Sequence, residues 1–105
     1  MIRVHVFRDG SGEITGFCVT GHAGLAESGN DVVCAAVSAL TQTAVLGLKE
    51  VARVNPKVDI APGSLCCERF RTTPSARIIL ETMVVGLKNI EQGYSSYLLV
   101  EDKEV

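Results

Sequence analysis

The chain has 105 residues and a mass of 11.2 kDa, the size of one domain with one hydrophobic core. Hydrophobic residues make up 47% of it and charged residues 21%, which excludes an intrinsically disordered segment. The formal charge of −2 argues against a basic surface, so no direct contact with nucleic acid is expected. No apolar run approaches the roughly 18 residues of a membrane span, and the first residues lack a signal-peptide core. We therefore expect a cytoplasmic domain without membrane contact.

The N-terminal residues predict a β-hairpin followed by a loop. Residues 2–8 alternate between apolar and polar side chains, which is typical of a half-buried strand. Glycine, serine and aspartate at 9–12 predict a turn, and residues 13–20 return as the second strand. The small and glycine-bearing segment from Gly21 to Asn30 predicts a loop.

A long helix is predicted from Asp31, its N-cap, to about Arg53, because apolar residues recur there every three or four positions. The residues of this apolar stripe are Val33, Val37, Leu40, Ala44, Leu48 and Val51. No charged residue lies between Asp31 and Lys49, so the helix should be covered on more than one side. A sheet can cover one side, and the other helix or a partner subunit must cover the rest.

The second half of the chain predicts two strands, a helix and a last strand. Residues 57–61 and 64–71 are the expected strands. Thr73 and Pro74 are typical of a helix start, as N-cap and first-turn residue. The helix should end at Gly93, and residues 95–100 should form the last strand before an acidic tail.

The predicted order is ββαββαβ, an α+β fold in a single domain over residues 1–105. A mostly antiparallel sheet with two helices packed on one face is the expected architecture.

The four cysteines are Cys18, Cys34, Cys66 and Cys67. No Cys-x-x-Cys pair occurs, and cytosolic cysteines stay reduced, so we expect neither a disulfide framework nor a bound metal. Cys66 and Cys67 should point to opposite faces of their strand, because they are adjacent. Cys18, and at least one of Cys66 and Cys67, should be small buried hydrophobes.

Cys34 and His22 carry the chemistry that the sequence suggests. With Asp31 as N-cap, Cys34 would lie in the first helical turn, where free N–H groups and the helix dipole stabilise a thiolate. His22, in the loop after the second strand, could complete a Cys/His pair for nucleophilic catalysis. The alternative is that Cys34 packs in the core and His22 is a surface residue. Asp31 could cap the helix or orient the imidazole, and Ser38 could support the thiolate or bond back to a helix carbonyl.

The segments Gly21-His22-Ala23 and Asp31-Val32-Val33-Cys34-Ala35-Ala36-Val37-Ser38-Ala39-Leu40 resemble the signature of the ribosomal-processing cysteine proteases, the Prp family. The resemblance covers essentially the whole chain. It implies an α/β homodimer, a thiol protease of ribosome biogenesis, without a cofactor. The nucleophile and base match Cys34 and His22, while Gly21, Asp31 and Ser38 match supporting positions.

The resemblance also implies a substrate, the N-terminal extension of large ribosomal subunit protein twenty-seven, cleaved after aromatic residues. Helix N-terminal amides would then hold the oxyanion, and the loop from Ala23 to Asn30 would act as a lid. Two other interpretations stay open. The chain could be a non-catalytic peptide-docking or ribosome-assembly module that uses the same loop and helix end. It could also bind a metal through His22, Cys34 and Cys18.

Overall fold

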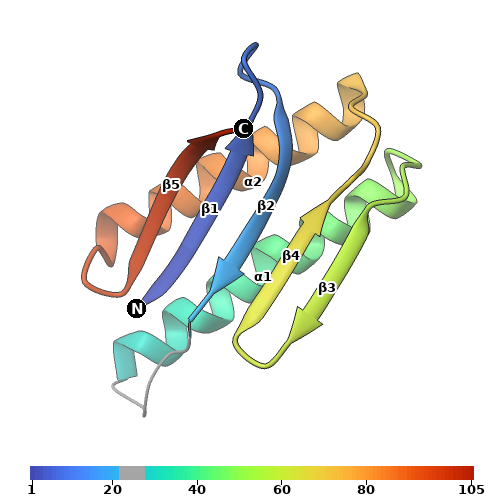
Figure 1. Cartoon of the computed structure of the whole chain (residues 1–105). Helices are drawn as coiled ribbons and strands as arrows, with labels where there is room; N and C mark the ends of the chain where they lie inside the picture. Colours follow the sequence, from blue (N-terminus) through green and yellow to red (C-terminus); the bar gives the residue numbers. More distant parts are fainter. Residues whose placement is uncertain (22–27) are drawn as a thin grey trace.

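The computed structural model describes residues 1–21 and 28–105, and of residues 28–31 it describes the backbone alone. The elements follow the predicted order ββαββαβ (Figure 1). They are β1 (Ile2–Arg8), β2 (Ile14–Thr20), α1 (Ser28–Glu50), β3 (Lys57–Ala61), β4 (Ser64–Glu68), α2 (Pro74–Gly93) and β5 (Leu98–Glu104).

The five strands form one mixed sheet in the order β3-β4-β2-β1-β5. All neighbouring strands are antiparallel except β1 and β5, which run parallel. Both helices lie behind the same face of the sheet, and the other face is open (Figure 1). The predicted two-layer architecture is therefore confirmed.

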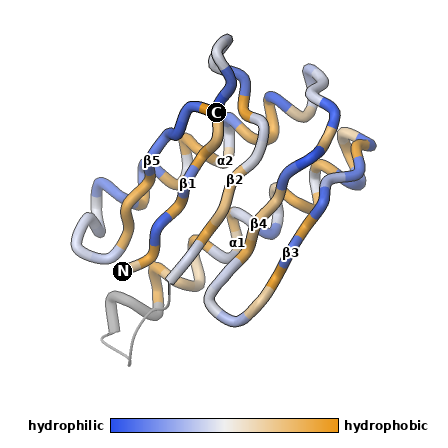
Figure 2. The backbone as a smooth tube through the Cα atoms, in the orientation of Figure 1, coloured by the Kyte–Doolittle hydropathy of each residue, from blue (hydrophilic) through white to orange (hydrophobic). Residues whose placement is uncertain are grey.

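The core lies between the sheet and the helices. Ile2, Val4 and Val6 of β1 are buried, whereas the residues between them are at least partly exposed, and Figure 2 shows the hydropathy alternating along this strand. Phe17 of β2 is fully buried on the same face. The alternation along β1 and β2 thus decides which face of the sheet receives the helices.

The two helices pack against each other where a glycine allows close approach. Gly86 of α2 faces Leu40 of α1, since a Cβ at position 86 would come within 3.1 Å of Leu40 Cδ1. Thr73 caps α2 as predicted, and its Oγ1 accepts a hydrogen bond of 3.2 Å from the N–H of Ala76. The segment Val32–Glu50 has the length and apolar composition of a membrane span, contrary to the sequence expectation, but it packs here as the core helix.

Several predicted boundaries are wrong. Helix α1 ends at Glu50 rather than near Arg53, and β4 ends at Glu68 rather than at residue 71. Helix α1 already includes Ser28, so Asp31 lies inside the helix and is not its N-cap. Strand β5 runs from Leu98 to Glu104 and includes the acidic residues that the sequence assigns to a tail. These residues pair with β1, so the backbone N–H and C=O groups along that edge of β1 find hydrogen-bond partners. Asp102 also accepts a hydrogen bond of 3.1 Å from Arg8.

A disulfide joins Cys18 of β2 to Cys66 of β4, which overturns the expectation of four reduced cysteines. The two residues are direct register partners, so their side chains lie next to each other on the same face of the sheet. Both are half-buried on the open face, and Cys18 is therefore not a core hydrophobe. Cys67 is fully buried. It points to the opposite face from Cys66, because adjacent residues of a strand alternate between the two faces of the sheet.

Candidate functional site

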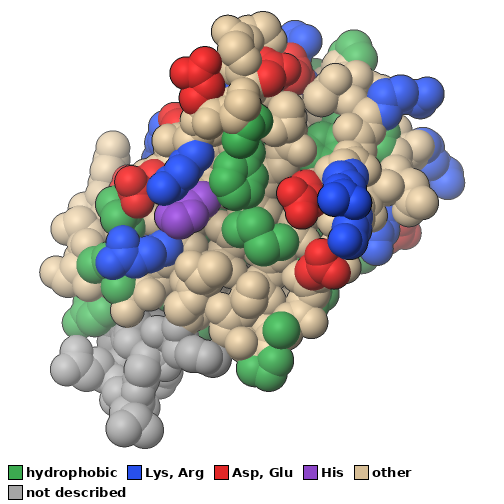
Figure 3. All heavy atoms as spheres, viewed as in Figure 1, with side chains coloured by type: hydrophobic (Ala, Val, Ile, Leu, Met, Phe, Trp, Pro, Cys, Tyr) green, Lys and Arg blue, Asp and Glu red, His purple; other side chains and the backbone are tan. Residues whose placement is uncertain are grey.

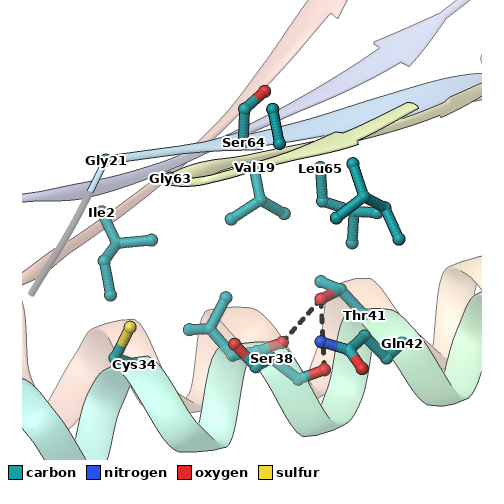
Figure 4. A pocket seen from close by; sticks show the side chains of 13 residues that line it. Ile2, Val19, Gly21, Cys34, Ser38, Thr41, Gln42, Gly63, Ser64 and Leu65 are labelled. Carbon is teal, nitrogen blue, oxygen red and sulfur yellow. Dashed lines mark hydrogen bonds between the residues drawn. The ribbon is translucent and has the colours of Figure 1, made fainter. Parts of the chain in front are cut away.

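A cavity of about 190 Å³ lies between α1 and the end of the sheet where β2 finishes and β4 begins. Figure 4 shows the helix below it and the strands above. Its walls come from the start of β1, the end of β2, the middle of α1 and the β3–β4 hairpin. The lining residues are Ile2, Val19, Gly21, Cys34, Val37, Ser38, Thr41, Gln42, Ile60, Ala61, Gly63, Ser64 and Leu65.

Cys34 provides the thiol of this cavity. It lies in the second turn of α1, half-buried, with its Sγ directed from the helix toward the sheet (Figure 4). The expected place in the first turn is wrong, because the helix already includes Ser28. The N–H of Cys34 is therefore one that bonds within the helix, and the dipole effect is strongest one turn earlier. Exposure to the cavity, and not contact with free N–H groups at the helix start, is therefore what makes Cys34 a candidate site residue.

Ser38 and Thr41 continue the cavity wall along α1. Ser38 lies one turn beyond Cys34 and is exposed, so its hydroxyl is accessible to a bound peptide. Thr41 is buried, and its Oγ1 donates a hydrogen bond of 2.8 Å to the carbonyl oxygen of Val37. The hydroxyl of Thr41 is thus satisfied within the helix, which leaves Ser38 as the more available polar group.

Gly21 closes the cavity at the end of β2. Its φ is +101°, a backbone conformation that side chains with a Cβ rarely adopt. A Cβ at this position would also collide with the carbonyl oxygen of Met1. The N–H of Gly21 donates a hydrogen bond of 3.0 Å to the carbonyl oxygen of Gly63, in the turn between β3 and β4. Only glycine fits here. Its positive φ and its hydrogen bond to Gly63 set the direction in which the chain leaves β2.

The structure brings three of the five predicted site residues together, Cys34, Ser38 and Gly21. His22 and most of the predicted lid, whose span is 23–30, lie outside the described residues. Asp31 belongs to the backbone of α1, but its side chain also lies outside the described part. The pairing of Cys34 with His22 and the orienting role of Asp31 therefore stay predictions.

The other three cysteines are placed away from the cavity. Burial raises the pKa of Cys67 to about 11, with a smaller opposing effect of Lys49, so this thiol stays protonated near neutral pH. Cys18 and Cys66 are bonded to each other on the open face of the sheet. Cys34 is thus the one cysteine of the four that is both free and open to a cavity.

The metal-binding alternative loses one of its ligands in this arrangement. Cys18 is held in the disulfide and faces away from the helix layer, whereas Cys34 lies between the sheet and α1. Within residues 1–21 and the described part of the remainder, no cluster of three His, Cys, Asp or Glu side chains could hold a metal ion.

The β3–β4 hairpin is the part of the site that sequence reasoning missed. Ile60, Gly63, Ser64 and Leu65 line the cavity, although they lie some thirty residues beyond Cys34 in the chain. Pro62-Gly63 indicated a turn, but no local pattern indicated that this turn would lie opposite α1. The pairing of β4 with β2 places it there.

A free thiol that opens into a cavity, carried by a helix of an α+β fold, is what a cysteine hydrolase needs as its nucleophile. The family model of cysteine protease Prp matches residues 1–99, and the chain belongs to this family. It is therefore a cysteine protease.

Named relatives cover almost the whole chain. The ribosomal processing cysteine protease Prp of Bacillus subtilis is 34% identical over 110 residues, which cover 95% of this chain and 96% of the relative. The protein of the same name from Staphylococcus aureus is 32% identical over 107 residues, covering 98% and 100%. A crystal structure of Prp from S. aureus with a covalently linked product peptide matches with a TM-score of 0.88 and 28% identity, covering 98% of this chain and 100% of that one.

Proposed function

We propose that this chain is a cytoplasmic ribosomal-processing endopeptidase with a Cys34–His22 dyad. Its substrate is the N-terminal extension of large ribosomal subunit protein twenty-seven. The names of the B. subtilis and S. aureus relatives support the ribosomal role. The covalent product peptide in the S. aureus structure supports a mechanism with a covalent enzyme intermediate.

The accessibility of Cys34 is the observation that carries this proposal. Of the two free thiols, Cys67 is fully buried in the core, and Cys34 opens into a cavity that a peptide can enter. A nucleophile must reach the carbonyl carbon of the substrate, so a thiol sealed in the core is excluded.

The proposed reaction follows from the chemistry of a thiol and an imidazole. The Cys34 thiolate attacks the scissile carbonyl carbon, and the resulting tetrahedral intermediate expels the amine of the leaving peptide. His22 gives that amine its proton, and a thioester remains on Sγ. Water then attacks the thioester, with His22 accepting a proton, which releases the carboxylate and restores the thiol.

The walls of the cavity fit a peptide with apolar residues before the cleaved bond. Ile60 on the hairpin is 73% exposed although it is a large hydrophobic residue, and it lines the cavity together with Leu65 and Val19. Burial of a substrate aromatic side chain against such residues contributes binding energy in proportion to the apolar area removed from water. This matches the aromatic residues that the family resemblance places before the scissile bond.

The homodimer is also part of this proposal. On the outer side of the helix layer, Val51, Ile78 and Val85 are 72%, 66% and 70% exposed. Val51 and Ile78 line an apolar groove of about 410 Å³ between α1 and α2. A second copy would remove this surface from water. Sedimentation should report a dimer for the wild-type chain and a weaker dimer for Ile78→Glu.

The test of the function is cleavage of a peptide that spans the N-terminal extension, followed by mass spectrometry of the products. The wild-type chain should cleave one bond, directly after the aromatic residues. Cys34→Ala and His22→Ala should each lose cleavage, and Cys67→Ala is the matched control that should retain it. Retained cleavage in Cys34→Ala or His22→Ala would contradict the dyad. Binding of the peptide without cleavage by the wild-type chain would instead favour the docking module.

A further inference from the structure

A row of five side chains crosses the open face of the sheet, one from each strand. Taken across the sheet from β5 to β3, they are Glu101, His5, Cys18, Cys66 and Asp59. Each is the direct register partner of the next. Directly opposite residues on one face of a sheet have their Cβ atoms about 5 Å apart. The disulfide therefore has an imidazole beside one of its sulfurs and a carboxylate beside the other.

The disulfide in this row faces solvent. The helices cover only the opposite face (Figure 1), and Cys18 and Cys66 are each partly exposed. Figure 3 looks onto the same open face, where a histidine lies among basic, acidic and hydrophobic side chains. Disulfides that solvent can reach are the ones that exchange with thiols, whereas disulfides sealed in a core are inert.

His5 is held in place beside the disulfide. Its Nε2 lies 3.8 Å from Oε1 of Glu101, and its side chain is 28% exposed. The contact with Glu101 orients the imidazole ring within the row. A cation at this position stabilises the negative charge that develops on a sulfur when the disulfide opens.

We propose that Cys18–Cys66 is a reversible thiol–disulfide exchange site for low-molecular-weight thiols, with His5 as the residue that stabilises the leaving thiolate. The site lies on the open face of the sheet, whereas Cys34 lies between the sheet and α1. The proposal is therefore independent of the proteolytic function and can fail or succeed without it.

The exchange consists of two displacements. An incoming thiolate attacks Sγ of Cys66, forms a mixed disulfide there and breaks the bond to Cys18, whose sulfur leaves as a thiolate beside His5. A second thiolate attacks the small-molecule sulfur of the mixed disulfide and releases Cys66 as a thiolate. The protein disulfide gains two electrons and two protons, and two thiols are oxidised to one small-molecule disulfide.

The charged groups that face His5 come from two strands, β1 and β5. Arg3 precedes it on the same face of β1, and Glu101 and Lys103 lie on the same face of β5. On β2 the facing residue is Cys18 itself, with Gly16 and Thr20 on either side along the strand. Arg3 is thus the matched control, a cation on the same face that lies outside the row.

The experiment follows the reduction of the native wild-type protein by glutathione. Native samples are alkylated with excess iodoacetamide at neutral pH, then acidified and digested, and mass spectrometry measures alkylation of Cys18 and Cys66, with buried Cys67 as the unreactive reference. The native disulfide should be reduced without unfolding, through a glutathione adduct on Cys66. In His5→Gln the rate constant per glutathione thiolate should be about threefold lower than in the wild type, the size expected for a less stabilised leaving thiolate. Arg3→Gln should behave as the wild type.

Several outcomes would overturn the proposal. One is the recovery of Cys18 and Cys66 as free thiols from aerobically purified protein that glutathione disulfide cannot oxidise. Another is reduction that occurs only in denaturant, which would make the disulfide purely structural. A third is a His5→Gln variant with the exchange rate of the wild type, which would remove His5 from the exchange.

Discussion

The N–H of Gly21 donates a hydrogen bond of 3.0 Å to the carbonyl oxygen of Gly63, although the two residues belong to different hairpins. This bond ties the end of β2 to the turn between β3 and β4. Both residues line the cavity into which Cys34 opens. The hydrogen bond therefore holds two walls of the cavity at a fixed distance from each other, directly before His22 in the chain.

Gly21→Ala should lower both stability and proteolysis. The positive φ of Gly21 costs an alanine about 1–2 kcal/mol, and the collision of its Cβ with the carbonyl oxygen of Met1 adds to that cost. Thermal unfolding and kcat/KM on the peptide would measure the two effects.

Gly12→Ala is the matched control for this substitution. Gly12 also has a positive φ, +86°, but no atom lies within 4 Å of the position its Cβ would take. It should lose stability by the conformational cost alone and keep its kcat/KM. Equal losses of activity in the two variants would contradict the role of Gly21 at the cavity.

Alkylation should distinguish the two free cysteines over a wide pH range. Iodoacetamide should modify Cys34 in the native protein between pH 7 and 9, because this thiol opens into the cavity. Burial raises the pKa of Cys67 to about 11, so Cys67 should react only after unfolding. Peptide mapping after alkylation measures both. Fast native labelling of Cys67 would show that the core around β4 opens more readily than the structure implies.

Ser38→Ala should reduce kcat/KM with little change in stability. Ser38 is exposed on α1, so its replacement should change the free energy of unfolding by less than about 0.5 kcal/mol. Its hydroxyl faces the cavity that holds Cys34, and loss of one hydrogen bond there should cost about tenfold in rate at most. Ser75→Ala, also an exposed serine on a helix but outside both the cavity and the α1–α2 groove, should leave the kinetics unchanged. Identical kinetics for Ser38→Ala and the wild type would show that Ser38 has no part in the reaction.

An ion pair at the other end of the sheet gives a prediction about acid stability. Arg8 donates two hydrogen bonds to Glu81, of 2.8 and 3.0 Å, and thereby lowers the pKa of Glu81. A carboxylate with a lowered pKa in the folded state stabilises the fold above its ordinary pKa, and this contribution disappears as pH falls through the folded-state value. Because the Glu81 side chain is 42% exposed, the contribution near neutral pH is about 0.5–1 kcal/mol.

Glu81→Gln should therefore be less stable than the wild type at pH 7, and the difference should shrink toward zero as the pH falls below 4. Urea unfolding at several pH values measures this difference. Glu104→Gln, an exposed glutamate at the end of β5, is the control that should show a smaller change. A stability difference that grows in acid would contradict the lowered pKa of Glu81. Peptide cleavage at neutral pH should not change, because Glu81 does not line the cavity.

Local patterns in the sequence were enough to predict the order of elements. The alternation along β1 and the Thr73-Pro74 start of α2 each act within a few residues, and the structure confirms both. The predicted start of α1 and end of β5 were wrong. For β5 the reason is physical. Pairing with β1 keeps polar residues such as Glu101 and Lys103 in a strand, and no single-segment pattern reports that pairing.

The candidate site was predictable only where one segment carries it. The predicted places of Cys34 near a helix start and of His22 after the second strand suggested the pair, with Ser38 one turn beyond Cys34, and the family resemblance then strengthened this hypothesis. The hairpin wall with Ile60 and the Cys18–Cys66 disulfide both depend on the pairing of β2 with β4, which are far apart in the chain. Such long-range contacts are a property of the folded chain and leave no local signal.

The central claim is that proteolysis runs through the thiol of Cys34. Titration with a peptidyl chloromethyl ketone that ends in the aromatic cleavage residue tests it most directly, with residual activity and the modified residue measured on the same samples. Activity should fall in proportion to alkylation of Cys34, while Cys67 stays unmodified. Full activity in protein alkylated completely at Cys34, or lost activity with Cys34 unmodified, would contradict it.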